Sequence, residues 1–159
     1  MRKNILTTLI AILLPLFVCP QTYKYIGMED GLSNRQVYAI EKDRKGYMWF
    51  LTPEGIDRYN GKEFKHYKLM DGDQELNSAI NLNWLYLDTD GVLWEIGKKG
   101  RVFRYESQHD RFQLVYKLPE QTEKEHNTPV SYGYVDEKGQ IWLCTRKQIY
   151  LYDLSLIHI

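Results

Sequence analysis

Acidic side chains are the first candidates for chemistry in this 159-residue sequence. A glycosidase uses two carboxylates that are held at a defined separation. Glu41, Asp57 and Glu95 are the acids that could form such a pair, but nothing in the sequence fixes a distance between any two of them. The sequence also lacks a glycine-rich phosphate loop and a Gly-x-Ser-x-Gly nucleophile motif. We therefore predict no catalytic residues in this segment.

Metal binding is the second possibility. The segment Asp88-x-Asp90-Gly91 resembles the beginning of a calcium-binding loop, which also needs an oxygen ligand at its fifth position and a glutamate at its twelfth. The chain has Val92 and Lys99 at those positions, so we expect an ordinary turn. The histidines have no zinc-ligand spacing; they are His66, His109, His126 and His158. No metal site and no cofactor are expected.

Cys144 is the only cysteine outside the first twenty residues, which excludes an internal disulfide there. It directly follows Trp142-Leu143 in an expected strand. A small core thiol is therefore a better interpretation than a nucleophile.

Aromatic residues are the remaining candidates for ligand contact. Trp49, Trp94 and Trp142 recur at one position of a repeat and are expected to pack between repeats. Four other aromatics lie on the strands expected to be innermost and could stack on sugar rings: Trp84, Tyr86, Tyr132 and Tyr134. Ordinary strand packing is the alternative for all four. Arg35 and Gln36, just before the first inner strand, are weaker candidates.

Short strands separated by tight turns must position these residues. Between Val37 and Tyr67 the sequence predicts a type I turn at 43–46, a corner at 53–55 and a type I′ hairpin at Asn60-Gly61. Four strands joined in this way make one antiparallel sheet. Such a small sheet cannot bury both of its faces alone, so it needs neighbours of its own kind.

Those neighbours are further copies of the same pattern. The motif Asp-x-x-Gly-x-x-Trp occurs three times, ending at Trp49, Trp94 and Trp142, with intervals of 45 and 48 residues. A four-stranded unit with this period is typical of a propeller blade. We predict an all-β fold: a partial β-propeller at 21–153, with about three four-stranded antiparallel blades near 37–70, 82–118 and 130–153. The polar connections 71–81 and 119–128 fit ligand-contacting loops and solvated linkers equally well.

Residues 1–20 are expected to form a helical signal peptide. Arg2 and Lys3 precede an apolar run from Ile5 to Val18, which is shorter than the roughly 20 residues of a membrane span. An uncleaved anchor is the alternative. At the other end, residues 154–159 resemble translated adapter sequence more than a blade strand, so we expect a non-native tail.

Composition and charge exclude further classes. The sequence is 43% hydrophobic and 14% aromatic, which predicts a globular rather than a disordered chain. Without the signal peptide, 19 basic residues face 21 acidic ones. This balance provides no electrostatic footprint for nucleic acid or for an anionic membrane.

The first copy resembles a known family. Gly31-Leu32-Ser33, followed by Val37-x-x-Ile40-x-x-Asp43-x-x-Gly46-x-x-Trp49 and Gly55-Ile56-x-x-Tyr59, is similar to the two-component regulator propeller repeat. The resemblance covers nearly all of Tyr23 to Asp153. The chain departs from the family pattern after each tryptophan, where it keeps only part of the usual Gly-Thr pair. The third copy also has Gln148 where the first two have Gly55 and Gly100.

The resemblance implies the periplasmic sensor region of a hybrid two-component histidine kinase, as found in Bacteroidetes. Such sensors have two many-bladed propellers, a small β-sandwich, a membrane helix, a kinase core, a receiver and a DNA-binding domain. Three blades cannot close a ring, because both end blades would expose apolar faces. We therefore expect an exported N-terminal fragment of a parent sensor that is anchored in the inner membrane.

The expected role is non-enzymatic sensing. The full extracellular region would bind an oligosaccharide and change how two protomers of the parent associate. This segment would contact no nucleic acid, and it would reach the membrane only through a downstream helix. Two alternatives remain open: an exported propeller enzyme acting on polysaccharide, and a protein-interaction scaffold.

Overall fold

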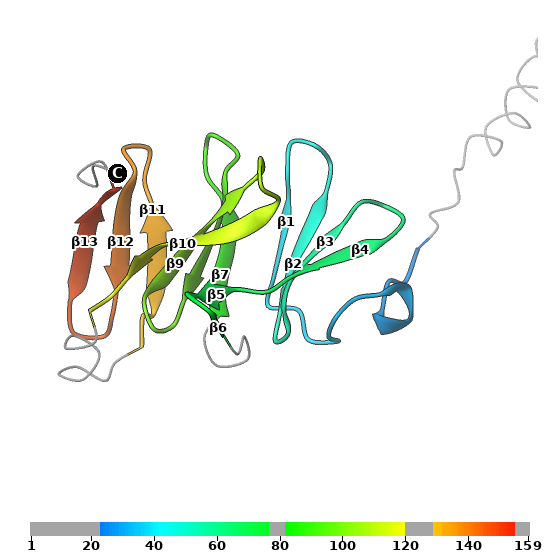
Figure 1. Ribbon diagram of the computed structural model, residues 1–159, viewed down its shortest axis with the longest axis horizontal. Coiled ribbons are helices and arrows are strands. Elements are labelled where there is room, and N and C mark those ends of the chain that lie inside the picture. Colours follow the sequence, from blue (N-terminus) through cyan, green and yellow to red (C-terminus); the bar gives the residue numbers. More distant parts are fainter. Residues whose placement is uncertain (1–22, 77–81, 120–128, 155–159) are drawn as a thin grey trace, which may run out of the picture.

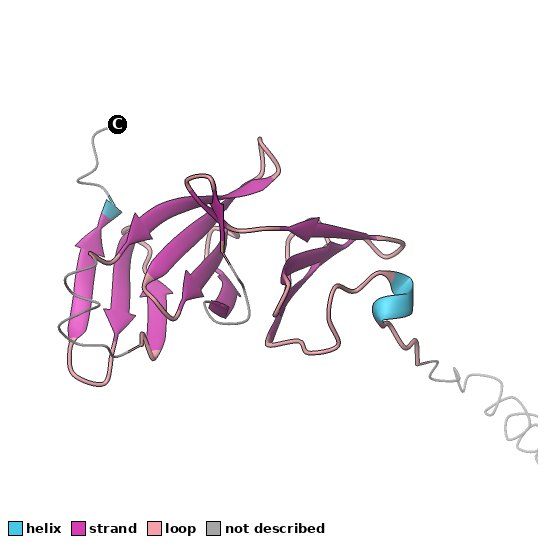
Figure 2. Ribbon diagram, turned by 60° about the horizontal axis from the view of Figure 1, so that its bottom comes forward, coloured by secondary structure: helices cyan, strands magenta, loops and turns pink. Residues whose placement is uncertain are grey.

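The computed structural model describes residues 23–76, 82–119 and 129–154. Nearly all regular structure in these residues is β, and the short 3₁₀ turn at Met28–Asp30 lies outside the sheets (Figure 2). The predicted all-β fold is confirmed. Within the described ranges, no helix is long and apolar enough to cross a membrane. The predicted signal peptide and residues 155–159 lie outside the described residues.

Three antiparallel sheets lie side by side along the molecule (Figure 1). Blade 1 has the strand order β1 (Ala39–Lys42), β2 (Met48–Thr52), β3 (Gly55–Tyr59) and β4 (Phe64–Tyr67). Blade 2 comprises β7 (Leu82–Leu87), β8 (Leu93–Gly97), β9 (Arg101–Glu106) and β10 (Arg111–Lys117). Blade 3, as far as the structure describes it, comprises β11 (Tyr132–Val135), β12 (Gln140–Cys144) and β13 (Ile149–Asp153). Each blade is a meander, as predicted.

The repeated Asp-x-x-Gly-x-x-Trp motif makes the turn between the first two strands of each blade. In blade 1, the carboxylate of Asp43 accepts the backbone N–H groups of Lys45 and Tyr47 at Oδ1 and the indole N–H of Trp49 at Oδ2, each at 2.9 Å. Gly46 closes the turn with φ of 88°, a left-handed conformation that favours glycine. One aspartate thus fixes both the turn and the orientation of the tryptophan on the next strand.

The same three bonds occur in the other two blades, so the motif spacing has a direct structural cause. Asp88 accepts the indole N–H of Trp94 at 2.7 Å, and Asp136 accepts that of Trp142 at 3.0 Å. In both turns the aspartate Oδ1 accepts two backbone N–H groups, as Asp43 Oδ1 does in blade 1.

Two apolar cores hold the blades together. The core between blades 1 and 2 is built around Trp49, which is 1% exposed, with Leu51 and Phe103. The core between blades 2 and 3 is built around Trp94 with Ile96 and Leu143. The predicted packing role of these two tryptophans is confirmed, because each packs against the following blade.

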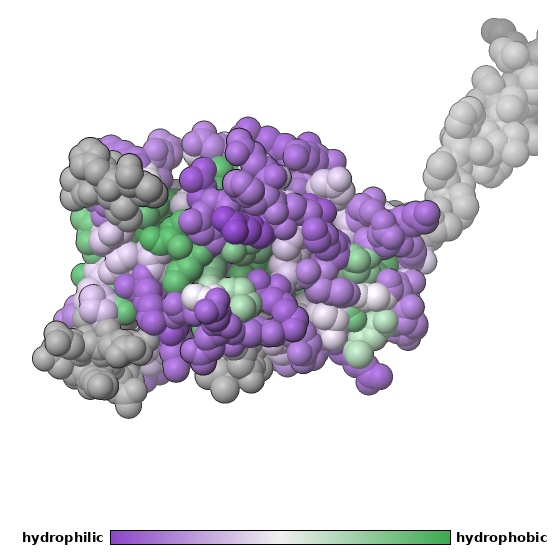
Figure 3. Space-filling model, in the orientation of Figure 1, coloured by the Kyte–Doolittle hydropathy of each residue, from purple (hydrophilic) through white to green (hydrophobic). Residues whose placement is uncertain are grey.

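The predicted packing role does not hold for Trp142, which differs from its two counterparts because it lies outside both apolar cores. It is 37% exposed and shares the surface of blade 3 with Ile149 and Leu151, which are 65% and 52% exposed. Figure 3 shows hydrophobic atoms at the end of the molecule formed by β13. The position equivalent to a buried tryptophan in blades 1 and 2 is therefore at the surface in this structure.

Two local features differ from the sequence-based expectation. The predicted type I′ turn is wrong, because it requires positive φ at both central residues and Asn60 does not have it. Instead, residues 60–63 form a longer loop in which the Asn60 side chain accepts the N–H groups of Lys62 and Glu63. The connection after β4 also contains an unpredicted two-stranded hairpin, β5 (Met70–Asp71) and β6 (Gln74–Glu75).

Candidate functional site

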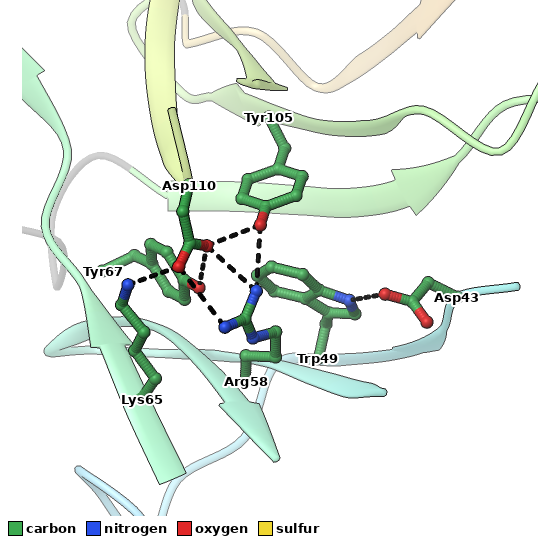
Figure 4. A network of polar contacts seen from close by, with 7 residues as sticks. All are labelled: Asp43, Trp49, Arg58, Lys65, Tyr67, Tyr105 and Asp110. Carbon is green, nitrogen blue, oxygen red and sulfur yellow. Dashed lines mark hydrogen bonds and ion pairs between the residues drawn. The ribbon is translucent and has the colours of Figure 1, made fainter. Parts of the chain in front are cut away.

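A network of polar contacts joins blade 1 to blade 2 (Figure 4). Its centre is Asp110, in the turn between β9 and β10. Lys65 Nζ lies 2.5 Å from Asp110 Oδ2, and Arg58 Nη1 lies 2.9 Å from Oδ1. The hydroxyls of Tyr67 and Tyr105 both donate to Oδ1 at 2.6 Å. Three of these four donors come from blade 1, so the network ties the two blades together.

Arg58 is held on its other side by aromatic rings. Its guanidinium carbon lies 4.7 Å from the ring centre of Tyr47, 5.4 Å from that of Trp49 and 5.5 Å from that of Tyr67. The side chain of Arg58 is only 18% exposed. Cation–π contact and a carboxylate partner together compensate for the partial desolvation of this guanidinium.

The pKa values in the network follow from these contacts. Burial favours the neutral form of Asp110, but the hydrogen bonds from Lys65, Tyr105 and Tyr67 and the charge of Arg58 outweigh it and hold the pKa of Asp110 well below its usual range. Burial, followed by the bond to Asp110, raises the pKa of Tyr105 to about 12. The same two causes raise the pKa of Tyr67. At neutral pH the network therefore consists of an ionised aspartate and neutral phenols.

A cavity of about 500 Å³ adjoins this network. Its lining includes Trp49, Arg58 and Tyr105, together with residues 43–45 and 106–109. Its volume is within the range of about 300–1,000 Å³ that is common for small-molecule sites. The cavity lies between blades 1 and 2.

The four predicted aromatic residues lie elsewhere, between the inner strands of blades 2 and 3. The rings of Trp84 and Tyr132 meet edge to face at 6.1 Å, and those of Tyr86 and Tyr134 stack at 6.0 Å. The Val135 N–H donates to the Tyr86 hydroxyl at 2.5 Å, and burial raises the pKa of that hydroxyl. Tyr132 and Tyr134 remain 55% and 40% exposed.

These contacts bring the four predicted aromatics into two pairs that connect β7 to β11. Their arrangement is compatible with packing, and it leaves faces of Tyr132 and Tyr134 accessible. A sugar-stacking role for this group stays a prediction. Arg35 is exposed in the segment before β1 and does not line the cavity described above.

The acidic residues considered for catalysis lie on three different strands, Glu41 on β1, Asp57 on β3 and Glu95 on β8. Asp57 is 1% exposed and accepts the Ser33 N–H at 2.8 Å, while its other oxygen lies 2.7 Å from His66 Nδ1. This arrangement anchors the lead-in segment to blade 1. Glu95 is fully buried on β8, and burial raises the pKa of the half-buried Glu41 on β1.

In the described part of the chain, no three histidine, cysteine, aspartate or glutamate residues lie together in a group that could hold a metal ion. His126 and His158 lie outside the described residues. Cys144 is a free, half-buried cysteine at the end of β12.

Sequence reasoning missed the network around Asp110 and the adjoining cavity. No local pattern in the sequence identifies these partners, because the residues come from different strands of two blades.

Comparisons with known proteins agree with the fold. Residues 31–54 match the family described as two component regulator propeller. The chain is similar to the extracellular domain of the hybrid two component system BT3049 from B. thetaiotaomicron, with 25% identity, a TM-score of 0.61 and coverage of 83% of this chain and 19% of that one. It also shares the fold of the extracellular domain of the hybrid two component system BT4673 from the same organism, with 20% identity, a TM-score of 0.59 and coverage of 81% and 16%.

No curated protein matches the chain. The chain spans less than a fifth of the length of the two solved structures that it resembles. The resemblance to the two-component regulator propeller repeat is confirmed, and the structural neighbours are extracellular domains of hybrid two component systems.

Proposed function

We propose that this chain, which carries the two-component regulator propeller repeat, forms the first blades of the ligand-sensing propeller of a hybrid two-component sensor histidine kinase. The observation that carries the proposal is the stack of blades pinned by Asp–Trp bonds, combined with the structural likeness to an extracellular sensor domain at 25% identity. In this proposal the segment lies in the periplasm and performs no catalysis itself.

The open face of blade 3 supports the idea that further blades follow in the parent protein. In blades 1 and 2 the pinned tryptophan is covered by the next blade, whereas Trp142 is 37% exposed beside Ile149 and Leu151. Apolar surface of this kind is stabilised when another sheet covers it. We assign the covering element to the next blade of the complete propeller.

We further propose that the complete propeller region senses glycan fragments. Tyr132 and Tyr134 present partly exposed rings near the inner strands, and aromatic faces are suited to stacking on sugars. A bound glycan would change the association of two parent protomers only if it binds one arrangement more tightly than the other. The membrane-crossing part of the parent would transmit that change to the kinase.

Calorimetry tests this function. The complete extracellular domain of the parent is titrated with a panel of oligosaccharides, and its dimerisation is followed by analytical ultracentrifugation with and without each sugar. We expect heat with at least one glycan and a coupled change in dimerisation. Dimerisation with a partner protein but no heat with any glycan would instead identify a scaffold.

A further inference from the structure

The cavity between blades 1 and 2 has an unusual charge distribution. Its lining includes the cationic side chains of Arg44, Lys45 and Arg104 in addition to Arg58. Arg58 is already matched by Asp110. Arg44 donates to the backbone carbonyl of Thr89 at 2.5 Å, which keeps its charge beside the cavity but fixes its position.

Lys45 and Arg104 have no carboxylate partner among the described residues. Arg104 is exposed, and its guanidinium carbon lies 5.8 Å from the ring centre of Trp94, a contact that orients the side chain without neutralising it. Lys45 is exposed in the Asp43–Gly46 turn, and its backbone N–H donates to Asp43, while its side chain has no hydrogen-bond partner within the described ranges.

The two acids that line the cavity are both engaged. The Asp43 carboxylate accepts three N–H groups, including that of Trp49. Glu106 lies 3.2 Å from Arg111 Nε and 3.3 Å from His109 Nδ1. The cationic groups therefore outnumber the acceptors that could satisfy them, and the cavity attracts an anion.

The rest of the lining fits a ring-shaped ligand rather than a small inorganic ion. Leu87, Val92 and Leu93 contribute apolar surface, and the volume of about 500 Å³ is far larger than one anion requires. Apolar surface beside a few charged donors is the combination that binds an acidic sugar, because the sugar carries both C–H faces and a carboxylate or sulfate group.

We propose that this cavity binds an anionic sugar residue whose carboxylate or sulfate is held by Lys45 and Arg104. The proposal rests on the proposed glycan-sensing function and names the ligand class and the place where it binds. Arg104, on β9 of blade 2, offers a planar fork that can take two oxygens of the anion, and Lys45 adds a flexible point charge from the first turn of blade 1. Blade 2 and the first turn of blade 1 would then hold the ligand together.

The experiment is a titration of the full 159-residue chain with three galactose-type trimers: one of galacturonic acid, one sulfated, and one neutral. The acidic trimers distinguish a carboxylate source from a sulfate source. We expect binding of at least one acidic trimer, with at least tenfold weaker binding of the neutral one and an affinity that falls as salt is raised.

The variants Lys45→Gln and Arg104→Gln each remove one charge from the cavity, and Lys99→Gln removes an exposed charge in the turn between β8 and β9 as a matched control. Each cavity variant should weaken binding of the acidic trimer about tenfold, as expected for loss of one charge-assisted hydrogen bond. The control should bind like the unaltered chain. Circular dichroism and thermal melting confirm that all variants fold alike.

Two results would overturn the proposal that this cavity binds an anionic sugar. One is equal binding of the neutral and acidic trimers, and the other is acidic-trimer binding that both cavity variants leave unchanged. If the complete extracellular domain binds a glycan while the cavity variants have no effect on it, the sensing function stands and this site is wrong. If no trimer binds the chain and no glycan binds the complete domain, both proposals fail.

Discussion

Replacing Asp110 with asparagine removes the charge at the centre of the network that joins blades 1 and 2. Asn is the right substitute because residue 110 has a positive φ of 50°, which asparagine tolerates better than alanine. The shape of the side chain and one acceptor oxygen are kept. The turn between β9 and β10 should therefore persist, and the measured effect should report the lost charge.

The size of the effect follows from the contacts. A hydrogen bond to a charged group contributes about 1.5–3 kcal/mol, and breaking a fully buried ion pair costs about 3–5 kcal/mol. The Asp110 side chain is 36% exposed, so solvent screening lowers both energies. Arg58 is only 18% exposed, so the loss of its carboxylate partner leaves a partly desolvated charge and keeps the cost from becoming negligible. We expect the free energy of unfolding to fall by about 2 kcal/mol.

Urea denaturation of the full chain measures this change through the unfolding midpoint. The matched control is Asp73→Asn, which removes the same charge at an exposed position between β5 and β6 and should change the free energy of unfolding by less than about 0.5 kcal/mol. A double-mutant cycle with Arg58→Met should give a coupling energy of about 1 kcal/mol. If Asp110→Asn costs no more than the control, the network does not hold the blades together.

Three further predictions concern the same scaffold. Because the pKa of Asp110 lies below the unfolded value of about 3.9, the stability that its charge contributes is complete above about pH 4 and is lost as pH falls toward the folded pKa. The difference in urea midpoint between the unaltered chain and Asp110→Asn should therefore be smaller at about pH 2.5 than at pH 7. A difference that stays constant with pH would contradict this prediction. Gly133→Ala should cost about 1–3 kcal/mol in urea denaturation, since a Cβ there would lie 2.6 Å from an Ile96 methyl group of blade 2, and an unchanged midpoint would show that blades 2 and 3 are less closely packed. Asp88→Ala should lower the thermal midpoint more than Asp136→Ala, because Trp94, which Asp88 holds, is buried between blades, whereas Trp142 is exposed. The reverse order would mean that burial of the tryptophan does not determine the loss of stability.

The repeat was predictable because one residue type performs several functions at a fixed spacing. The aspartate must accept backbone N–H groups two and four residues later and an indole N–H six residues later, so the spacing to Trp49 cannot vary without losing a bond. A glycine must close the turn in the left-handed region. Such local constraints are visible in one sequence, and three copies made them stand out.

The network around Asp110 could not be predicted because it occurs once and its members are far apart in the chain. Arg58 and Asp110 are 52 residues apart, and their contact depends on how two blades pack. The prediction of a type I′ turn at Asn60-Gly61 was wrong because a side-chain contact, which the local pattern does not show, decides the loop. The Asn-Gly pair fits a two-residue turn, but the asparagine side chain instead accepts the N–H groups of Lys62 and Glu63 and supports a longer loop.

The exposed position of Trp142 was only partly predictable: the repeat number implies an exposed apolar face on the end blade, but the repeat pattern predicted that this tryptophan packs between blades. The pattern shows that each tryptophan is equivalent, but burial depends on the sheet that follows. The ion pairs of Asp71 with Arg101 and Lys117, at 2.9 Å each, were missed for the same reason. They arise from the unpredicted β5–β6 hairpin, which connects blade 1 to the outer strands of blade 2.

Hydrogen exchange of the indole N–H groups, followed by NMR on the full chain, tests the stacked-blade account most directly. Trp49 and Trp94, at 1% and 5% exposed, should exchange slowly, and Trp142, at 37% exposed, should exchange distinctly faster. Replacing the aspartate of one blade should shift only the indole of that blade. Equal and rapid exchange of all three tryptophans would contradict the account, because no sheet could then be covering its neighbour.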